Sequence, residues 1–240
     1  MRSYSMWNHS MFSFAILVFV TFAGMVGVVQ ASECNIKPEP MSAVFSKSSA
    51  GRKSPPQVKS IHLQRSTKRV AIDYKDKNIT ELWELTKDKR LRLVKYFNEE
   101  KRGIAYQPNE IKSKGKENDW SAKQQLLSDN YLQTLDLVAT SGFGCNVVEH
   151  YRRTVGDTAI EVEYLKHLKL IKRYQVKKPD SAVLIQLTDY DHTEKPIEEY
   201  FTRLSKYKTT DYADIDDKES DPFLLKMKKL GLVEPMTSGF

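Results

Sequence analysis

The segment AIEVEYLKHLKLIKRYQV, residues 159–176, distinguishes a helical chain from a β-rich one. Glu163 and His167 are four residues apart, which is the spacing of neighbours on one helix face. The apolar side chains follow a different period, because they occupy seven of the nine even positions from Ile160 to Val176 but only two of the eight odd positions from Glu161 to Gln175. Alternation with a period of two is typical of strands. The segment therefore predicts strand structure, interrupted near Lys166.

Strands are also predicted on both sides of this segment. Residues 147–155 form an extended run that ends at the turn-like pair Gly156–Asp157, and residues 183–187 are a continuous apolar run typical of a buried strand. Earlier in the chain, five short runs alternate with polar turns, which predicts an antiparallel meander. These runs are centred on residues 61–63, 70–74, 79–86, 91–97 and 104–107.

Three segments have the spacing of amphipathic helices. In the first, Ser121 and Gln124 fit a capping box, and an apolar stripe continues to Val138. The second begins near Pro196, and the third begins at Asp221–Pro222, which fits an N-cap and a first-turn proline. The predicted fold class is α+β: a mainly antiparallel sheet of about eight or nine strands, with one mid-chain helix and two C-terminal helices packed on it. A curved half-barrel is one form that such a sheet takes.

The first residues have the pattern of an export signal. Arg2 precedes the uncharged run Met11–Val29, and Val29–Gln30–Ala31 fits a peptidase site. We expect cleavage after Ala31, and therefore a periplasmic or secreted protein that meets the membrane only transiently through residues 1–31. An uncleaved anchor is the alternative, because the run is long enough for a helix to span a bilayer.

The rest of the chain is predicted to contain a leader and one domain. Residues 32–57 are rich in Ser and Pro and poor in large apolar side chains. Such a segment buries too little surface to offset the entropy of ordering it, so we expect a flexible leader. Residues 58–240 then form a single β-rich α+β domain.

The composition and charge exclude several classes of protein. With 240 residues, 40% hydrophobic and 29% charged, the chain is neither a disordered tail nor a multi-span membrane protein. The net charge of +7 is unevenly distributed, since residues 58–116 carry +8 and residues 181–240 carry −4. A basic sheet could bind an anionic envelope surface or an exported protein partner, whereas export argues against nucleic acid.

Cys34 and Cys145 are the only cysteines in the sequence. Two cysteines are too few for a disulfide framework or for a zinc site made of cysteine alone. An exported chain meets oxidising conditions, in which this pair could form a disulfide. The expected position of Cys34 in a flexible leader argues against a fixed partner, so the pairing stays open.

His150, Arg152 and Arg153 are the candidates for binding an anion. Alternation puts His150 and Arg152 on one strand face, where an imidazole beside a guanidinium could bind an anion; the alternative is an ordinary polar face. Trp83 and Tyr164 are candidates for the wall of an apolar pocket that holds a lipid-like ligand in the concavity of the sheet. The other expected wall residues are Leu91, Leu93, Phe97 and Leu168.

An acidic segment lies between the last two predicted helices. Its candidates for docking a partner are Asp211, Asp214, Asp216, Asp217 and Glu219. The calcium-loop template fails, because Glu219 or Pro222 occupies the position that normally holds glycine. We expect no metal here, and either a solvated loop or one that docks on the basic sheet or on a basic partner.

No catalytic template fits the chain. The serine of Ser141–Cys145 lies outside the glycines, unlike that of a nucleophile elbow, and none of the four later histidines has a metal-site spacing. The sequence therefore favours an exported, non-catalytic binding or accessory protein without a cofactor. The alternative is a small exported hydrolase that uses His150 or His192 with an acidic residue. The predicted architecture resembles that of periplasmic lipoprotein carriers, which place helices against the concave side of a half-barrel, and this resemblance implies a lipid-like ligand.

Overall fold

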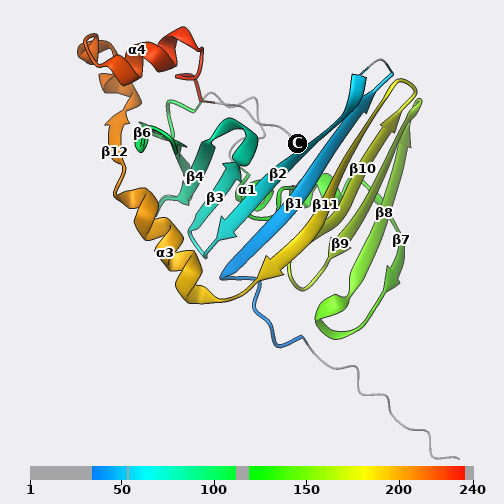
Figure 1. Ribbon diagram of the computed structural model, residues 1–240. Coiled ribbons are helices and arrows are strands. Elements are labelled where there is room, and N and C mark those ends of the chain that lie inside the picture. Colours follow the sequence, from blue (N-terminus) through cyan, green and yellow to red (C-terminus); the bar gives the residue numbers. More distant parts are fainter. Residues whose placement is uncertain (1–33, 53, 112–118, 236–240) are drawn as a thin grey trace, which may run out of the picture. The chain divides into compact units, whose positions relative to one another are not determined.

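The computed structural model describes residues 34–52, 54–111 and 119–235 (Figure 1). The strands are β1 (Met41–Gly51), β2 (Ser54–Arg65), β3 (Arg69–Tyr74), β4 (Ile79–Leu85), β5 (Leu91–Phe97), β6 (Arg102–Tyr106), β7 (Asp136–Ser141), β8 (Val148–Val155), β9 (Thr158–Leu165), β10 (Leu170–Lys178), β11 (Ser181–Asp191) and β12 (Lys208–Asp211). The α-helices are α1 (Trp120–Gln125), α2 (Asp129–Leu132), α3 (Glu194–Ser205) and α4 (Pro222–Lys229). Short 3-10 segments are η1 (Lys75–Lys77), η2 (Gly144–Asn146), η3 (Tyr212–Asp214) and η4 (Asp216–Lys218).

All twelve strands of the described residues belong to one sheet, in the order β12-β6-β5-β4-β3-β2-β1-β11-β10-β9-β8-β7. Neighbouring strands pair antiparallel, except for β12 and β6, which pair in parallel. The described residues fall within one compact unit, Ser32–Phe240. The α+β class and the dominance of an antiparallel sheet are therefore confirmed, although the sheet has more strands than the eight or nine predicted.

The period-two pattern predicted most of these strands correctly. Residues 159–176 lie in β9, β10 and the turn between them, where Lys169 adopts a left-handed conformation with a φ of 48°. The five early runs form β2 to β6, and the runs that flank residues 159–176 form β8 and β11. The helices expected near Pro196 and at Asp221–Pro222 are α3 and α4, and the Asp221 carboxylate caps α4 by accepting two backbone N–H groups.

The flexible leader predicted for residues 32–57 is wrong, because β1 lies there, between β2 and β11. Met41, Ala43 and Phe45 are 0% exposed and alternate with polar or partly exposed residues. Ser42, Ser46 and Ser48, which contributed to the linker-like composition, occupy the other face of this strand, whereas Ser49 lies on the core face. The predicted domain boundary at residue 58 is wrong for the same reason, because β1 precedes residue 58 and β2 crosses it.

The single mid-chain helix predicted from Ser121 to Val138 is also wrong. Asp119, not Ser121, is the N-cap of α1, and the helix ends where Leu126 adopts a left-handed conformation with a φ of 60°. The stripe continues into α2, which is only one turn long, and Val138 lies in β7, which pairs with β8. The three strands that the sequence pattern missed are β1, β7 and β12.

The two faces of the sheet have different coverings. The core face carries the larger hydrophobic cluster, which includes Ile72, Trp83 and Leu93 and packs against residues in and around α1, α2 and α4. The outer face carries a smaller cluster around Leu82 and Val94. This second cluster is completed by three buried residues of α3, namely Ile197, Phe201 and Leu204. The strands β3 to β6 are therefore covered on both faces.

Arg65, at the end of β2, is 1% exposed and donates hydrogen bonds only to backbone carbonyls. Its Nε and Nη2 both donate to Pro38, at 3.0 and 2.7 Å. Its Nη1 donates to Gln124 at 2.9 Å and to Lys169 at 2.8 Å, and Nη2 also donates to Leu168. Burial lowers the pKa of the guanidinium to about 10, which leaves it charged at neutral pH. One buried cation therefore joins β2 to three distant parts of the chain.

A disulfide joins Cys34 to Cys145, and their Cα atoms are 4.5 Å apart. It spans 111 residues and connects the segment before β1 to η2, between β7 and β8. The pairing that the sequence left open is thus present, and Cys34 has a fixed partner. A disulfide of this kind fits an oxidising compartment.

The predicted export segment, residues 1–31 with the run Met11–Val29, lies outside the described residues. In the part of the chain that the structure describes, none of the helices has the length and apolar character needed to cross a membrane.

Replacing Arg65 by Met is expected to lower the free energy of unfolding by at least about 3 kcal/mol, because four carbonyl oxygens around this buried side chain lose their donor. Urea unfolding followed by circular dichroism measures this loss. Arg52→Met is the matched control: the Arg52 side chain is 74% exposed and pairs with Asp180 at the surface, so a change below about 0.5 kcal/mol is expected. Similar losses in the two variants would contradict a central role for Arg65.

Replacing both cysteines by Ser is expected to lower the free energy of unfolding by about 2–4 kcal/mol, because the unfolded chain regains the freedom that closing the loop removes. Urea unfolding with and without reductant is the measurement. Reductant should destabilise the wild-type protein by a similar amount and leave the double variant unchanged. An unfolding midpoint that responds to neither treatment would show that Cys34–Cys145 contributes nothing to stability.

Candidate functional site

An apolar strip extends the core face beyond its fully buried part. Val176 in β10 lies directly opposite Ile160 in β9 and Val183 in β11, so the three side chains point to one face of three neighbouring strands. All three are half-buried and pack at the edge of the main core. The next row inward is buried and consists of Val162, Tyr174 and Ile185. We refer to Ile160, Val176 and Val183 as the apolar strip.

Lysine side chains border the strip on the side of β1 and β2. Lys47 lies opposite Ile185 in β11 and opposite Lys59 in β2. Burial lowers the pKa of Lys47, and repulsion from Lys77 and Lys59 lowers it further. Asp76 acts in the other direction and forms an ion pair with Lys59 at 2.9 Å. This border therefore has three positive charges and one negative charge.

Arg153 borders the strip on the side of β8, because it lies opposite Ile160 in the register of β8 and β9. Its guanidinium donates to the carbonyl of Thr134 at 2.7 Å. Tyr151, two residues inward, donates its hydroxyl proton to Glu149 at 2.7 Å. Burial, together with this carboxylate, raises the pKa of Tyr151 to about 12. Of the three anion-binding candidates, Arg153 is thus the one beside the strip.

Trp83 and Tyr164, the candidates for a pocket wall, lie inside the main core. Trp83 is 1% exposed, its Nε1 donates to Glu81 at 3.2 Å, and the ammonium of Lys123 lies 3.8 Å from its ring centroid. The hydroxyl of Tyr164 donates to Gln125. The other expected wall residues are buried as well, at 0–3% exposed: Leu91, Leu93, Phe97 and Leu168. These six side chains therefore contact the protein itself, whereas the strip is an accessible apolar part of the core face.

Two charged side chains are buried on the core face. Glu81 and Lys95 lie opposite each other in β4 and β5, and both are 0% exposed. Lys95 donates from Nζ to the carbonyl oxygen of Leu232 at 3.0 Å and to that of Glu234. Burial lowers the pKa of Lys95 to about 8, although the carboxylates of Glu81 and Glu234 raise it. This cluster attaches the segment after α4 to the middle of the sheet.

His150 and Arg152 point to the outer face, so they lie on the opposite side of β8 from Arg153. The Nε2 atom of His150 is 2.8 Å from the hydroxyl of Ser141 in β7. The Nε atom of Arg152 is 3.7 Å from a carboxylate oxygen of Glu161 in β9. The structure therefore does not bring the three predicted residues together in one site.

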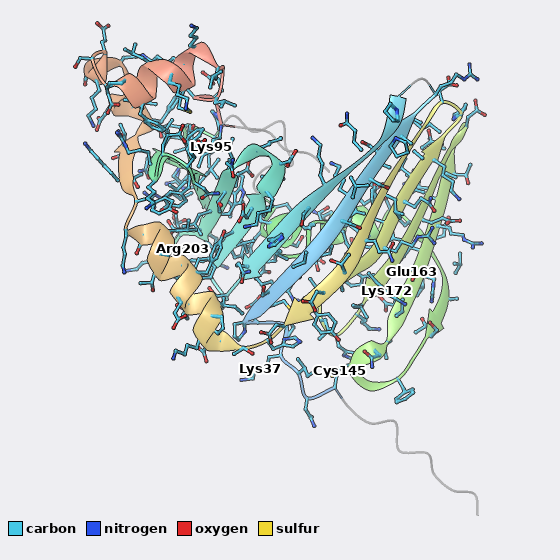
Figure 2. All side chains as sticks on the ribbon, viewed as in Figure 1. Lys37, Lys95, Cys145, Glu163, Lys172 and Arg203 are labelled. Carbon is cyan, nitrogen blue, oxygen red and sulfur yellow. A yellow bond between two sulfur atoms is a disulfide. The ribbon has the colours of Figure 1, made fainter. Side chains whose placement is uncertain are left out.

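The hydrolase alternative needs a histidine within hydrogen-bond reach of a carboxylate. Glu163 lies opposite His150 in β9, but its carboxylate oxygens are 3.5 Å from Lys172 and 3.9 Å from Arg173 (Figure 2). Both ring nitrogens of His192 are buried and have no hydrogen-bond partner in the described part of the chain. Among the described residues, no histidine is hydrogen-bonded to a carboxylate, so these contacts do not support a hydrolase.

The five acidic candidates for docking a partner are all exposed and lie on and around η3 and η4. They are Asp211, Asp214, Asp216, Asp217 and Glu219. Asp216 pairs with Lys228 of α4 at 2.8 Å, and Ile215 anchors the segment in the main core. Within the described ranges, no group of three or more His, Cys, Asp or Glu residues is placed to hold a metal ion.

The sequence pattern predicted that the three strip residues lie in strands, but it did not identify them as a binding site. Ile160, Val176 and Val183 belong to the same apolar patterns as their buried neighbours, and Lys47 falls in the expected leader. The signal that separates them is position: each strip residue lies three residues from one of the turns Gly156–Asp157 and Pro179–Asp180, and strand ends next to turns have the least cover by other elements.

Comparisons with known proteins identify no family. No protein-family model matches the chain, and no curated protein matches it. A structure of PNGF-II is 12% identical with a TM-score of 0.40, covering 74% of this chain and 33% of that one, so this chain spans about a third of its length. A LolA superfamily protein from Nitrosomonas europaea is 7% identical with a TM-score of 0.36, covering 68% and 90%. A DUF1329 family protein from Desulfovibrio piger is 11% identical with a TM-score of 0.33, covering 64% and 85%.

The stability of the protein is expected to rise with pH between about 8 and about 10, because Lys95 releases its proton in the folded chain before the unfolded chain does. The unfolded chain binds more protons in this window, so raising the pH favours the folded state. Urea unfolding midpoints of the wild type and Lys95→Met are compared across the window, and the variant should lack this part of the rise. An NMR titration of 13C-labelled lysine checks the value directly; a Lys95 resonance that titrates near 10.5 would contradict it.

Proposed function

We propose that the protein is an exported, non-catalytic binding protein whose ligand is an amphiphile with a hydrocarbon chain and an anionic headgroup. The observation that carries this proposal is the apolar strip. Ile160, Val176 and Val183 stay half-exposed and adjacent, between basic side chains on both sides. Contiguous apolar side chains that remain accessible are typical of interaction sites.

A hydrocarbon chain suits the strip because it would cover apolar side chains without needing hydrogen bonds. The strip crosses three neighbouring strands, or roughly 10 Å at about 4.8 Å per strand spacing. Each buried methylene contributes about 0.8 kcal/mol, so a chain of several methylenes is needed for useful affinity. The curved half-barrel expected from the sequence would place the strip on its concave side.

An anionic headgroup suits the border of the strip because of its charge. Lys47, Lys59 and Lys77 outnumber Asp76, and the pKa of Lys47 is lowered first by burial and then by repulsion from Lys77 and Lys59. A bound carboxylate or phosphate would relieve that repulsion. Arg153 on the far side of the strip adds a second positive border. A cationic or neutral headgroup would gain nothing from these groups.

The exported location rests on two supporting features. The Cys34–Cys145 disulfide fits an oxidising compartment such as the periplasm or the extracellular space. The N-terminal run Met11–Val29 has the pattern of an export signal. An amphiphile carrier in such a compartment would shield the ligand's hydrocarbon chain from water during transfer.

The test is the binding of a fluorescent fatty acid, with its methyl ester as the neutral counterpart. Ile160→Asp places a charge on the strip and is expected to weaken binding of the fatty acid at least about tenfold. Ala159→Asp is the matched control, because Ala159 is the neighbour of Ile160 in sequence but lies on the outer face. The affinity of this variant for the fatty acid should stay within about twofold of that of the wild type. Thermal unfolding of both variants verifies that they are folded.

A second variant tests the headgroup. Lys47→Gln should weaken binding of the acid about threefold or more and leave binding of the methyl ester unchanged. Only the acid has a negative charge that the Lys47 ammonium can attract. Equal affinities of Ile160→Asp and Ala159→Asp would show that the strip is not the site. A protein that binds neither the acid nor the ester would overturn the proposal.

A further inference from the structure

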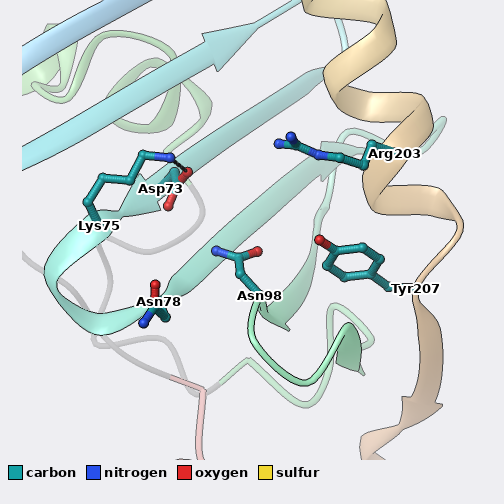
Figure 3. A pocket seen from close by; sticks show the side chains of 6 residues that line it. All are labelled: Asp73, Lys75, Asn78, Asn98, Arg203 and Tyr207. Atoms are coloured by element: carbon teal, nitrogen blue, oxygen red, sulfur yellow. Dashed lines mark hydrogen bonds and ion pairs between the residues drawn. The ribbon is translucent and has the colours of Figure 1, made fainter.

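A pocket lies on the outer face, on the opposite side of the sheet from the apolar strip. It is a pocket of about 200 Å³ between the ends of β3, β4 and β5 and the C-terminal end of α3 (Figure 3). Six residues line it: Asp73, Lys75, Asn78, Asn98, Arg203 and Tyr207. All six side chains carry polar groups, so this pocket differs in kind from the strip.

Asp73 provides the main evidence that the pocket accommodates a ligand. The residue is 3% exposed. Its Oδ2 accepts from Lys75 at 2.7 Å and from the hydroxyl of Tyr200 at 3.3 Å. Its Oδ1 is buried and has no hydrogen-bond partner among the described residues. An acceptor left without a donor in the interior is costly, and such atoms are rare in folded proteins. A ligand that donates a hydrogen bond to Oδ1 would remove this cost.

The other walls supply both donors and acceptors. The Nδ2 atom of Asn98 donates to the hydroxyl of Thr80 at 3.0 Å, which leaves its second N–H group available. Asn78 is exposed and holds a left-handed conformation with a φ of 53° at the end of η1. The guanidinium of Arg203 lies 4.8 Å from the ring centroid of Tyr200. Amide, guanidinium and carboxylate groups thus surround one small volume from the strand ends and from α3.

The charges select a neutral ligand. An anion would face the Oδ1 atom of Asp73, which repels negative charge. A cation would face Lys75 and Arg203, which repel positive charge. A neutral hydroxyl group meets neither penalty, because it can donate to the carboxylate and accept from an amide or guanidinium. A volume of about 200 Å³ holds several water molecules and so has room for one small ring with its hydroxyl groups.

We propose that this pocket binds a neutral polyhydroxylated group, of the size of one monosaccharide unit. One ring hydroxyl donates to Oδ1 of Asp73, and further hydroxyls take the place of water at Asn78, Asn98 and Arg203. The site is independent of the amphiphile site, because Asp73 and the strip lie on opposite faces of the sheet.

The experiment is an NMR titration of the 15N-labelled protein with neutral monosaccharides: glucose, galactose, mannose and N-acetylglucosamine. At least one of them should shift the side-chain amide signals of Asn78 and Asn98. Asn78→Gly keeps the left-handed backbone, and Arg203→Gln removes the guanidinium but leaves a polar side chain at this exposed position. Each variant should weaken sugar binding about tenfold, the cost of about one hydrogen bond. Lys206→Gln is the matched control, exposed on the same end of α3 but outside the pocket, and should bind as the wild type does.

Two charged probes, glycinamide and inorganic phosphate, complete the experiment. Shifts of the Asn98 amide with a charged probe but with no sugar would overturn the proposal, as would a complete absence of shifts. Unchanged sugar affinity in both Asn78→Gly and Arg203→Gln would overturn it too. Ile160→Asp should leave sugar binding intact, so failure at this pocket and failure at the apolar strip are distinguishable.

Discussion

The buried guanidinium of Arg65 is the constraint on which the arrangement of the described chain depends. A group with five N–H donors and no acceptor must find carbonyls in the interior, and it finds them before β1, at the end of α1 and between β9 and β10. These carbonyls are 27, 59 and 103–104 residues away in sequence. The hydrogen bonds of the Arg65 guanidinium therefore need all three segments in place at once. The disulfide restrains the same N-terminal segment, because Pro38 follows Cys34 by only four residues.

Buried charge also determines how one part of the core face is covered. Lys95 draws the segment after α4 across the sheet, and Tyr106 strengthens that cover by donating its hydroxyl to Val233 at 2.5 Å. The strands β9, β10 and β11 lie in the other half of the sheet, beyond β1. Because side chains of a strand alternate between faces, Ile160 lies on the same face as Val162, two residues nearer the turn. Val162 is buried, whereas Ile160 is only half-buried. The apolar strip is therefore the row of core-face positions next to the buried row of Val162, Tyr174 and Ile185, where burial becomes partial.

Periodicity predicts a strand where one face is continuously apolar, which is why β9 and β10 could be predicted from the sequence. In β1 the core-face positions after Phe45 are Lys47 and Ser49, so the pattern stops halfway and the composition is that of a linker. All of β7 is exposed, and backbone pairing with β8 alone defines it. The apolar strip and the pocket at Asp73 could not be predicted from the sequence for a different reason. Periodicity does not separate a half-exposed Ile160 from a buried neighbour, and it shows Asp73 only as a polar strand position, not as a carboxylate with one unpartnered oxygen.

One short turn contributes to both proposed sites. In η1, Lys75 pairs with Asp73 at 2.7 Å on the outer face, whereas Lys77 acts on Lys47 on the core face. Asp76, between them, forms the ion pair that holds the turn to β2. A 3-10 turn directs successive side chains about 120° apart, so three charged residues in a row must serve different surroundings. The lysine beside the pocket neutralises a buried carboxylate, and the lysine beside the strip adds to an unbalanced positive charge. The same turn thus makes one face suited to neutral hydroxyl groups and the other suited to an anionic headgroup.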